Sequence, residues 1–139
     1  MASYQKFEQF VESLAEKEHD LGADQMQVAL TNAANAPVAG NSDLADLTQV
    51  SYTNLSAQTI TTTTSAQASG IYKLVLADLV LTASGTVAGF RYVVIFNQDA
   101  TTPDDQLLGF YDYGSDLVLE NSETLTIDFD DSGGFITIT

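Results

Sequence analysis

His19 is the only histidine in the chain, and the chain has no cysteine, so chemistry is considered there first. General acid–base catalysis needs a group that orients the imidazole and a nucleophile or water within its reach. Serine and threonine are plentiful, but the nucleophile-elbow pattern G-x-S-x-G does not occur. The position favours a structural role, in which His19 closes an N-terminal helix at the negative end of its dipole. We therefore predict no catalytic residue.

Three aspartates, Asp128, Asp130 and Asp131, form the acidic segment DFDDSGG, and a second acidic segment, TTPDDQ, precedes them. Carboxylate oxygens suit Ca²⁺, which makes these three residues candidate ligands. Neither segment has the EF-hand order of ligands, and Asp with Gly at a hairpin tip is explained by turn geometry alone. We predict no metal and no other cofactor. Paired carboxylates for glycoside hydrolysis are a further interpretation, although the chain has no tryptophan to form a sugar platform.

Arg91 is one of only four basic residues, and it interrupts an otherwise apolar segment, Phe90–Phe96. It either pairs with a cross-strand acid such as Asp112 or anchors an interface. Apart from Arg91, the segment is apolar on both faces, which predicts a central strand covered by a second sheet, a helix or a partner chain. Arg91 and Tyr92 are interface candidates for this reason.

The elements that position these residues follow from hydrophobic spacing. Apolar side chains recur at helical intervals at Tyr4, Phe7, Phe10, Val11 and Leu14. This spacing predicts an amphipathic helix over residues 3–20, capped by Ser3 and stopped by Gly22. We expect the helix to cover its own sheet. If it docks on a partner instead, its interface candidates are Tyr4, Phe7, Phe10 and Val11.

After Gly22 the hydrophobic period changes to two. The stretch 26–31 alternates apolar with polar or small residues, which predicts a half-buried strand, and SDLADLTQV allows a short second helix capped by Ser42. Residues 56–70 are rich in Thr and Ser, which predicts an edge strand or a loop. Residues 71–139 alternate apolar runs with turn residues. They predict antiparallel strands at 71–83, 90–97, 106–113, 116–120, 123–130 and 134–139.

The predicted fold class is therefore mainly β. We expect residues 1–139 to form a single domain, an antiparallel β-sandwich or small barrel with one N-terminal amphipathic helix. No apolar run approaches the length that spans a bilayer, and the N-terminal segment lacks the apolar core of a secretory signal.

Charge narrows the class of function further. The net charge is −15, from 4 Lys and Arg against 19 Asp and Glu. So acidic a surface repels nucleic-acid phosphates and anionic membranes, so neither is an expected partner. No phosphate-binding loop, dinucleotide fingerprint or pair of metal-binding histidines is present. These features predict an acidic, β-rich structural or interaction protein rather than an enzyme.

Two stretches resemble small structural proteins from the head-gene region of tailed bacteriophages. The first, residues 7–37, contains F-x-x-F-V-E-x-L-A, then His-x-Leu-Gly, then V-A-L-T-N before a proline. The second, residues 89–139, contains F-R-Y-V-V, D-Y-G and the closing I-D-F-D-x-S-G-G-F-I-T-I. The two stretches cover more than half of the chain, and residues 38–70 match only loosely.

The resemblance implies a non-enzymatic virion component made in the cytoplasm of a host bacterium. The implied role is capsid decoration, or cement, in which a homotrimer on the outer surface of the head bridges neighbouring major capsid proteins. The first alternative is a tail tube or head–tail connector subunit, for which TITTTTSAQASG would be an extended arm. The second is a Ca²⁺-dependent or carbohydrate-binding module.

Overall fold

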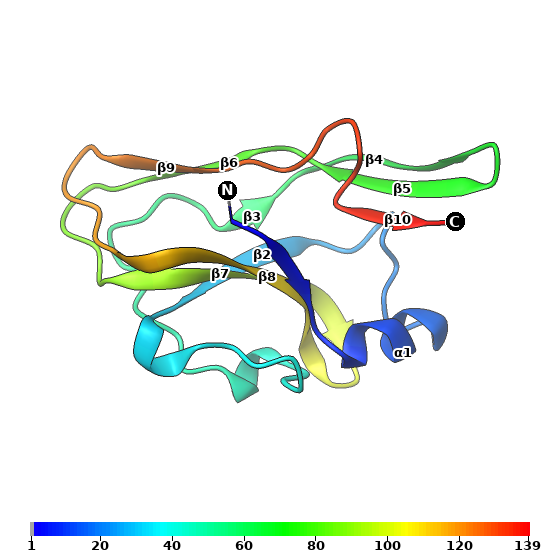
Figure 1. Ribbon diagram of the computed structural model, residues 1–139, viewed down its shortest axis with the longest axis horizontal. Helices are drawn as coiled ribbons and strands as arrows, with labels where there is room; N and C mark the ends of the chain where they lie inside the picture. Colours follow the sequence, from blue (N-terminus) through cyan, green and yellow to red (C-terminus); the bar gives the residue numbers. More distant parts are fainter. Residues whose placement is uncertain (1) are drawn as a thin grey trace.

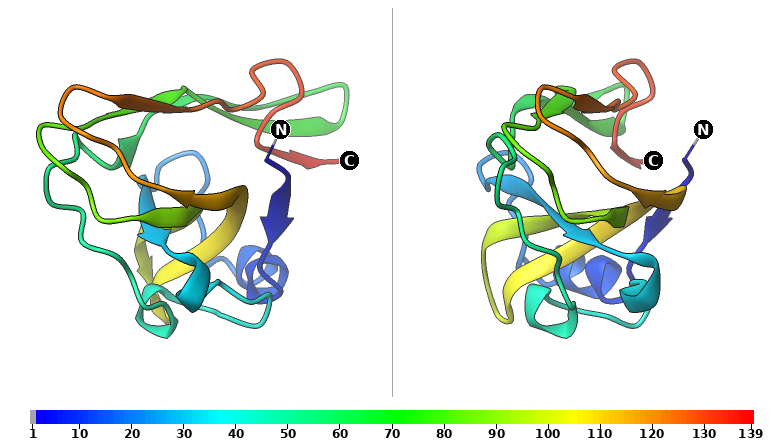
Figure 2. Two further views of the ribbon diagram at one scale, coloured as in Figure 1. Left: turned by 60° about the vertical axis from the view of Figure 1, so that its left-hand side comes forward. Right: turned by 90° about the vertical axis from the view of Figure 1, so that its left-hand side faces the viewer.

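The chain folds into two facing layers of antiparallel β-sheet, shown in Figures 1 and 2. The computed structural model describes residues 2–139. One layer is a five-stranded sheet, and the other consists of a three-stranded and a two-stranded sheet placed end to end. The fold is mainly β, as the alternating pattern predicts. The layers do not close into a barrel, because each keeps free edge strands.

The five-stranded sheet has the strand order β1-β8-β7-β2-β3. Its strands are β1 (Tyr4–Lys6), β2 (Met26–Thr31), β3 (Thr59–Ile60), β7 (Phe90–Thr101) and β8 (Asp104–Leu117). The long β7–β8 hairpin supplies the central strand of the sheet and the strand between it and β1 from a single stretch of sequence. The segment 116–120 is not a strand of its own, since β8 continues to Leu117 and residues 118–120 lie outside any strand.

The opposite layer combines two small sheets. The three-stranded sheet has the order β10-β5-β4, formed by β4 (Thr62–Ala68), β5 (Ile71–Leu76) and β10 (Ile136–Ile138). The two-stranded sheet pairs β6 (Leu79–Thr82) with β9 (Thr124–Ile127). The predicted strand 71–83 is thus interrupted at residues 77–78. At this interruption the Asp78 carboxylate accepts a hydrogen bond from the Phe129 backbone N–H at 2.9 Å.

The N-terminal helix is much shorter than the predicted span 3–20. Helix α1 covers only Gln9–Ala15, and Tyr4–Lys6 form β1 instead. The open edge of β8 supplies hydrogen-bond partners for this segment, and the Tyr4 ring lies against Gly109, where any β-carbon would collide with it. Pairing with the sheet therefore overrides the helical spacing, and Ser3 is not the cap. No helix within residues 2–139 is long and apolar enough to span a membrane.

The helix ends at Ala15, with Glu16 as its C-cap, and Lys17 rather than Gly22 turns the chain away from it. Lys17 has a φ of 72°, and the next N–H, that of Glu18, donates to the Ser13 carbonyl at 2.9 Å while the Lys17 N–H donates to Leu14. These two bonds and the left-handed residue make a Schellman ending, in which a non-glycine residue takes the position that glycine usually fills.

The second predicted helix is reduced to a single turn. The 3₁₀ helix η2 spans Leu44–Asp46, and its cap is Asp43, which forms a reciprocal capping box with Asp46, rather than Ser42. A second 3₁₀ helix, η1, spans Ala33–Asn35. Both belong to the long connection between β2 and β3, which crosses the outer face of the five-stranded sheet (Figure 1).

The Thr-rich segment 56–70 is folded into strands. It contains β3 and β4, and β4 forms a hairpin with β5 at the edge of the three-stranded sheet. Six of the seven β4 residues are threonine, serine or alanine, and most of the seven are exposed, so the strand buries little apolar surface. The segment TITTTTSAQASG is therefore a hairpin arm of the sheet and not an extended tail.

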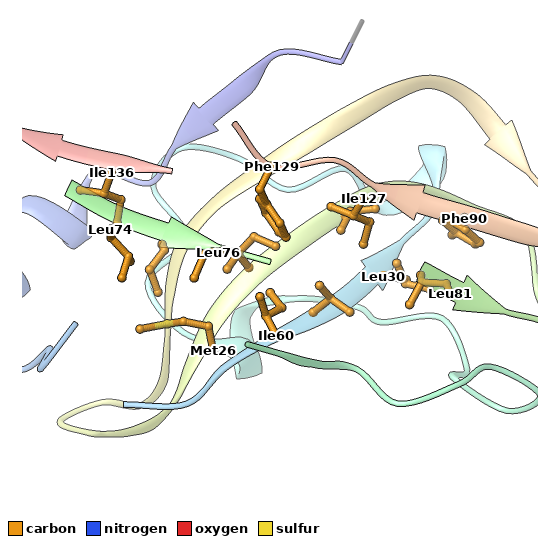
Figure 3. Close-up of a cluster of buried hydrophobic side chains, with 14 of the residues drawn as sticks. Met26, Leu30, Ile60, Leu74, Leu76, Leu81, Phe90, Ile127, Phe129 and Ile136 are labelled. Carbon is orange, nitrogen blue, oxygen red and sulfur yellow. The ribbon is translucent and has the colours of Figure 1, made fainter. Parts of the chain in front are cut away.

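The main core lies between the two layers. Figure 3 shows its side chains converging from both, with Met26 and Leu30 of β2 facing Leu74, Leu76 and others across the interlayer space. A second, smaller cluster lies on the outer face of the five-stranded sheet beneath η2. It contains the buried side chains of Phe7, Ala29, Tyr92, Val94, Phe96, Leu107 and Phe110.

Strand β7 is buried on both faces, as its apolar sequence predicts, and the chain itself covers both. Val93 and Ile95 face the main core, whereas Tyr92 and Val94 face the smaller cluster. Strict alternation would place Phe90 on the side of Tyr92, but Phe90 belongs to the main core. The ladder with β8 shifts register between residues 90 and 92, and such a bulge reverses the side on which the following residues point.

Candidate functional site

His19 lies on the loop after α1, buried against β7. Its Nδ1 is 2.9 Å from Asn97 Nδ2, which also donates to Asp24 Oδ2 at 2.6 Å, and its ring packs on Phe10 with centroids 5.2 Å apart. The predicted role at the helix dipole is wrong, because α1 ends at Ala15 and the partner of His19 is a side chain of the sheet. His19 instead ties the loop to β7.

The surroundings of His19 keep its ring neutral. Burial lowers the pKa of His19, and the Asp24 charge and the Gln106 side chain oppose that shift less strongly. Because an amide nitrogen only donates, the ring accepts from Asn97 at Nδ1 and carries its proton on Nε2. His19 Nε2, a donor, and Gln106 Oε1, an acceptor, are both buried without a hydrogen-bond partner. The cluster is thus held together by Asn97, with one donor and one acceptor left unpaired.

A cavity of about 440 Å³ borders this loop and is lined by His19, Ser65 and Tyr72 among others. The two hydroxyl groups lie 2.8 Å apart and bond to each other. No hydrogen bond in the described part of the chain joins either hydroxyl to His19, whose Nδ1 faces Asn97. Nucleophilic catalysis needs a hydroxyl paired with a base, and that pair is not assembled in this cavity.

A larger cavity, of about 750 Å³, opens between the two layers, beside strands β1, β8 and β9. We call it the interlayer groove. Its walls include Tyr4, Tyr111 and Tyr113 from the five-stranded sheet and Leu125, Asp128 and Phe129 from the opposite layer. The groove exists because β1 is only three residues long, so that it leaves β8 uncovered beyond Tyr111.

Aromatic rings line the groove and connect the layers. Tyr111 contacts Tyr4 with centroids 5.6 Å apart and Phe129 at 6.2 Å. Phe135 contacts both Tyr4 and Phe129, at 5.0 and 5.6 Å, and thereby completes a ring of four aromatic residues. Tyr113 stands at the mouth with 54% of its surface exposed. The groove thus presents a preformed aromatic wall to solvent.

All the charge on the lining of the groove is negative. Asp128, Asp130 and Asp131 line it, and among its described lining residues there is no Lys, Arg or His. Burial, and then the charge of Asp128, raise the pKa of Tyr111 to about 12. Burial also raises the pKa of Tyr4 well above its usual range. Aromatic faces beside carboxylates attract a cation that carries an apolar body.

The three Ca²⁺ candidates do not converge. Asp130 Oδ1 accepts from the Ser132 and Gly133 N–H groups at 2.9 and 2.7 Å, and these bonds lower the pKa of Asp130. Its carboxylate therefore shapes the turn before β10. Within residues 2–139 no group of three or more carboxylate or histidine side chains is close enough together to hold a metal ion.

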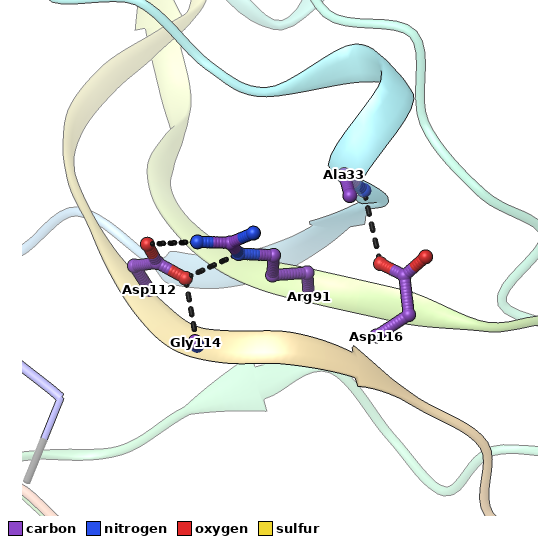
Figure 4. A network of polar contacts seen from close by, with 5 residues as sticks. All are labelled: Ala33, Arg91, Asp112, Gly114 and Asp116. Atoms are coloured by element: carbon purple, nitrogen blue, oxygen red, sulfur yellow. Dashed lines mark hydrogen bonds and ion pairs between the residues drawn. The ribbon is translucent and has the colours of Figure 1, made fainter.

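Arg91 and Asp112 pair across β7 and β8, which is the first of the two interpretations that the sequence allows for Arg91 (Figure 4). Arg91 Nε and Nη2 donate to the two Asp112 oxygens at 2.7 and 2.9 Å, and the Gly114 N–H also donates to Asp112 at 2.8 Å. The ion pair raises the pKa of Arg91 and lowers that of Asp112. The guanidinium also lies 5.2 Å from the centre of the Tyr92 ring. These contacts within the chain occupy Arg91.

The remaining interface candidates separate into core and surface. Phe7, Phe10 and Tyr92 are buried within the chain, so their side chains are not available to a partner. Val11 is 50% exposed on α1, and Tyr4 lines the interlayer groove. Phe10 joins the main core, in agreement with a helix that covers its own sheet.

The groove residues Tyr111, Tyr113, Leu125 and Phe129 were not identified from the sequence. The available signal was local: aromatic and apolar residues alternate along GFYDY and TLTIDFD, which places one set on a common face of each strand. That both sets face the same opening depends on how two layers pack, and a single strand pattern does not contain this information.

The comparisons with known proteins add no relative. No protein family, no curated protein and no solved structure matches this chain.

Proposed function

We propose that this chain is a non-enzymatic structural protein of a tailed-phage virion, specifically a capsid decoration protein. It binds the outer surface of the head as a homotrimer and bridges neighbouring major capsid proteins. The proposal rests on the resemblance of residues 7–37 and 89–139 to head-region phage proteins and on one structural observation, the free edge of β4.

The outer edge of β4 is open to another chain. Within residues 2–139, β4 pairs only with β5, and its sequence TTTSAQA contains no charged residue and no proline. Monomeric proteins usually protect a strand edge with charge, proline or a covering segment, because an open edge recruits another strand. The chain has 19 acidic residues and places none of them on β4. Such an edge favours a protein that works in an assembly.

The net charge of −15 supports an outer position. An acidic protein is repelled by packaged nucleic acid and therefore suits the side of a shell that faces away from it. The extensive core and the paired strands allow the domain to hold its shape as a spacer between larger subunits.

The test is binding to heads from a phage whose copy of this gene is deleted. We expect the purified chain to cosediment with such heads and to raise the temperature at which they release DNA. Ala66→Lys adds a charge to the exposed edge strand β4 and should weaken binding, whereas Val38→Lys adds the same charge to an exposed loop and should not. Failure of the wild-type chain to bind heads would refute the proposal.

The β4–β5 hairpin also favours a second candidate, a tail tube subunit. Figure 1 shows the hairpin extending away from the rest of its layer. Hairpins with open, uncharged edges can join into a continuous sheet around a ring, and an acidic lumen would let DNA pass without sticking. Polymerisation of the purified chain into hollow tubes would favour this candidate over decoration.

A further inference from the structure

The interlayer groove is bordered by strand edges that have no partner. β9 pairs only with β6 in the described chain, and its sequence TLTI contains no charge and no proline. On the other side, β1 covers β8 only at residues 109–111. An extended peptide can add to such an edge through backbone hydrogen bonds while alternate side chains enter a neighbouring pocket. The geometry therefore suits a strand-like occupant.

The lining of the groove selects the side chains of that occupant. Tyr111 and Phe129 offer apolar and aromatic surface at the base, and Tyr113 offers an exposed ring at the mouth. Asp128 and Asp131 supply negative charge on the rim, and within residues 2–139 neither forms a salt bridge. Lys73 Nζ donates to the Ser132 carbonyl at 2.7 Å, and its charge acts on Asp130. A long aliphatic stem with a cationic head fits both the wall and the rim.

A second copy of this chain is a poor occupant. Each copy carries a net charge of −15, so two acidic rims would repel each other. Of its four basic residues, Arg91 is paired with Asp112 and Lys73 is bound to Ser132. Lys6, on the edge strand β1, and Lys17, after α1, are exposed, but they are isolated from each other in the sequence and belong to different elements. The chain therefore offers no extended basic segment of its own to fill the groove.

We infer that the interlayer groove binds an extended segment of the major capsid protein that presents Lys or Arg side chains to the aromatic wall. The inference rests on the proposed function and deepens it, because it names the surface and the chemistry that hold the shell protein. The segment adds as a strand along β9, and its basic side chains lie between the tyrosine rings and the Asp128–Asp131 rim.

The first test uses a short synthetic peptide that alternates lysine and valine, titrated into the full-length protein by calorimetry. We expect saturable binding that weakens as salt is added, and no binding of the matched peptide that alternates glutamate and valine. Spermidine serves as a free organic cation without a backbone. If spermidine binds as tightly as the lysine peptide, or if both peptides bind equally, the inference is overturned.

The second test places the site. Tyr113→Ala and the double variant Asp128→Asn with Asp131→Asn change exposed groove residues, and each should weaken peptide binding by about tenfold. The matched control, Glu12→Gln with Glu16→Gln, removes the same charge from exposed positions on and next to α1 and should leave binding unchanged. Equal loss in the control would show general charge attraction and would overturn the assignment to the groove.

Head binding separates this inference from the proposed function. If wild-type protein binds deletion-mutant heads and the groove variants bind them equally well, the groove inference fails while the decoration role stands. If the wild-type protein binds the lysine peptide through the groove but does not bind heads, the decoration role fails and the groove remains a basic-peptide site.

Discussion

The buried cluster around His19 and the interlayer groove both place polar groups beside aromatic rings, and they differ in what these polar groups face. In the cluster, Asn97 bonds to both His19 and Asp24, and the loop is held against the sheet. In the groove, Asp128 and Asp131 face solvent beside open strand edges. The polar groups of the cluster point at one another inside the chain, whereas the carboxylates of the groove face solvent.

The comparison shows that residue type alone does not identify a functional site. The unique histidine drew attention because its residue type can do chemistry, yet its Nδ1 is occupied and its ring is buried. The groove contains ordinary tyrosines and aspartates, but their contacts leave a wall and a rim exposed. The presence of partners within the chain therefore separates a structural residue from a binding residue better than residue type does.

The largest expected effect on stability comes from removing the hydrogen bonds of the buried cluster around His19. Asn97→Ala removes the donor to the buried His19 Nδ1 and the acceptor of the Asp99 N–H, and groups left without a partner inside the protein cost about 1–3 kcal/mol each. The half-buried Asp24 keeps its hydrogen bond from the Asp20 N–H. We expect the free energy of unfolding in urea to fall by about 3 kcal/mol. Asn121→Ala, at an exposed turn, is the control and should change it by less than about 0.5 kcal/mol. Similar losses in both variants would show that the cluster has no special role.

Gly109→Ala disturbs the contact with Tyr4 at the border of the interlayer groove. The added methyl group would occupy the space of the Tyr4 ring, so the ring and β1 must move away from β8. Overpacking of this kind should cost about 2 kcal/mol and increase amide hydrogen exchange at residues 4–6. Gly40→Ala has open space around its new methyl group and serves as the control. Unchanged exchange in β1 would contradict the close contact between Tyr4 and Gly109.

Acidification should reduce the stability contribution of His19 before it reduces that of the aspartates. Burial lowers the pKa of His19, so the folded state favours the neutral ring, and the unfolded chain takes up the proton first as the pH falls below about 6.5. Stability from this group is full above that pH and declines toward the lower folded pKa. The carboxylates with lowered pKa, Asp46, Asp112 and Asp130, lose their contributions only below about pH 4.

The variant His19→Gln isolates the histidine contribution. Thermal unfolding at intervals between pH 7 and pH 4.5 should show a decline for the wild type that is absent in this variant. The pKa of Asp105 is raised, chiefly by burial, so this residue acts in the opposite direction and favours the folded state as the pH falls. Equal slopes for the two proteins would contradict the neutral, buried state of His19.

The smallest effect on stability should follow changes at the groove rim. Asp128→Asn with Asp131→Asn alters exposed side chains, so the free energy of unfolding should stay within about 0.5 kcal/mol of the wild type. A binding surface can lose its charge without loss of fold, whereas the His19 cluster cannot lose its amide. A destabilisation as large as that of Asn97→Ala would remove the distinction between the two regions.

The sequence allowed the central strands to be predicted better than their surroundings. Alternation along residues 26–31 located β2, and the run 90–97, apolar on both faces, located β7, because both patterns depend only on local order. The Arg91–Asp112 pair followed from the hairpin. The N-terminal helix was overextended, since helical spacing does not reveal that residues 4–6 gain more from the edge of β8. The Lys17 ending was missed because lysine rarely takes a left-handed conformation.

The groove could not be predicted for a different reason. It joins the end of β8 to β9 and the turn after it, and its volume depends on the short length of β1. These are properties of how two layers end, and no local pattern contains them. The aspartates Asp128, Asp130 and Asp131 were interpreted from the sequence only as candidate Ca²⁺ ligands, since the position of Asp128 near Tyr111 is not visible there.

The most direct test of the central claim is the position of this chain in an intact virion of the phage that encodes it. Electron cryomicroscopy should show the two-layer β-domain on the outer surface of the head, in contact with neighbouring capsid proteins and with the interlayer groove facing one of them. Density for this domain inside a tail tube, or virions that lack the domain altogether, would contradict the account.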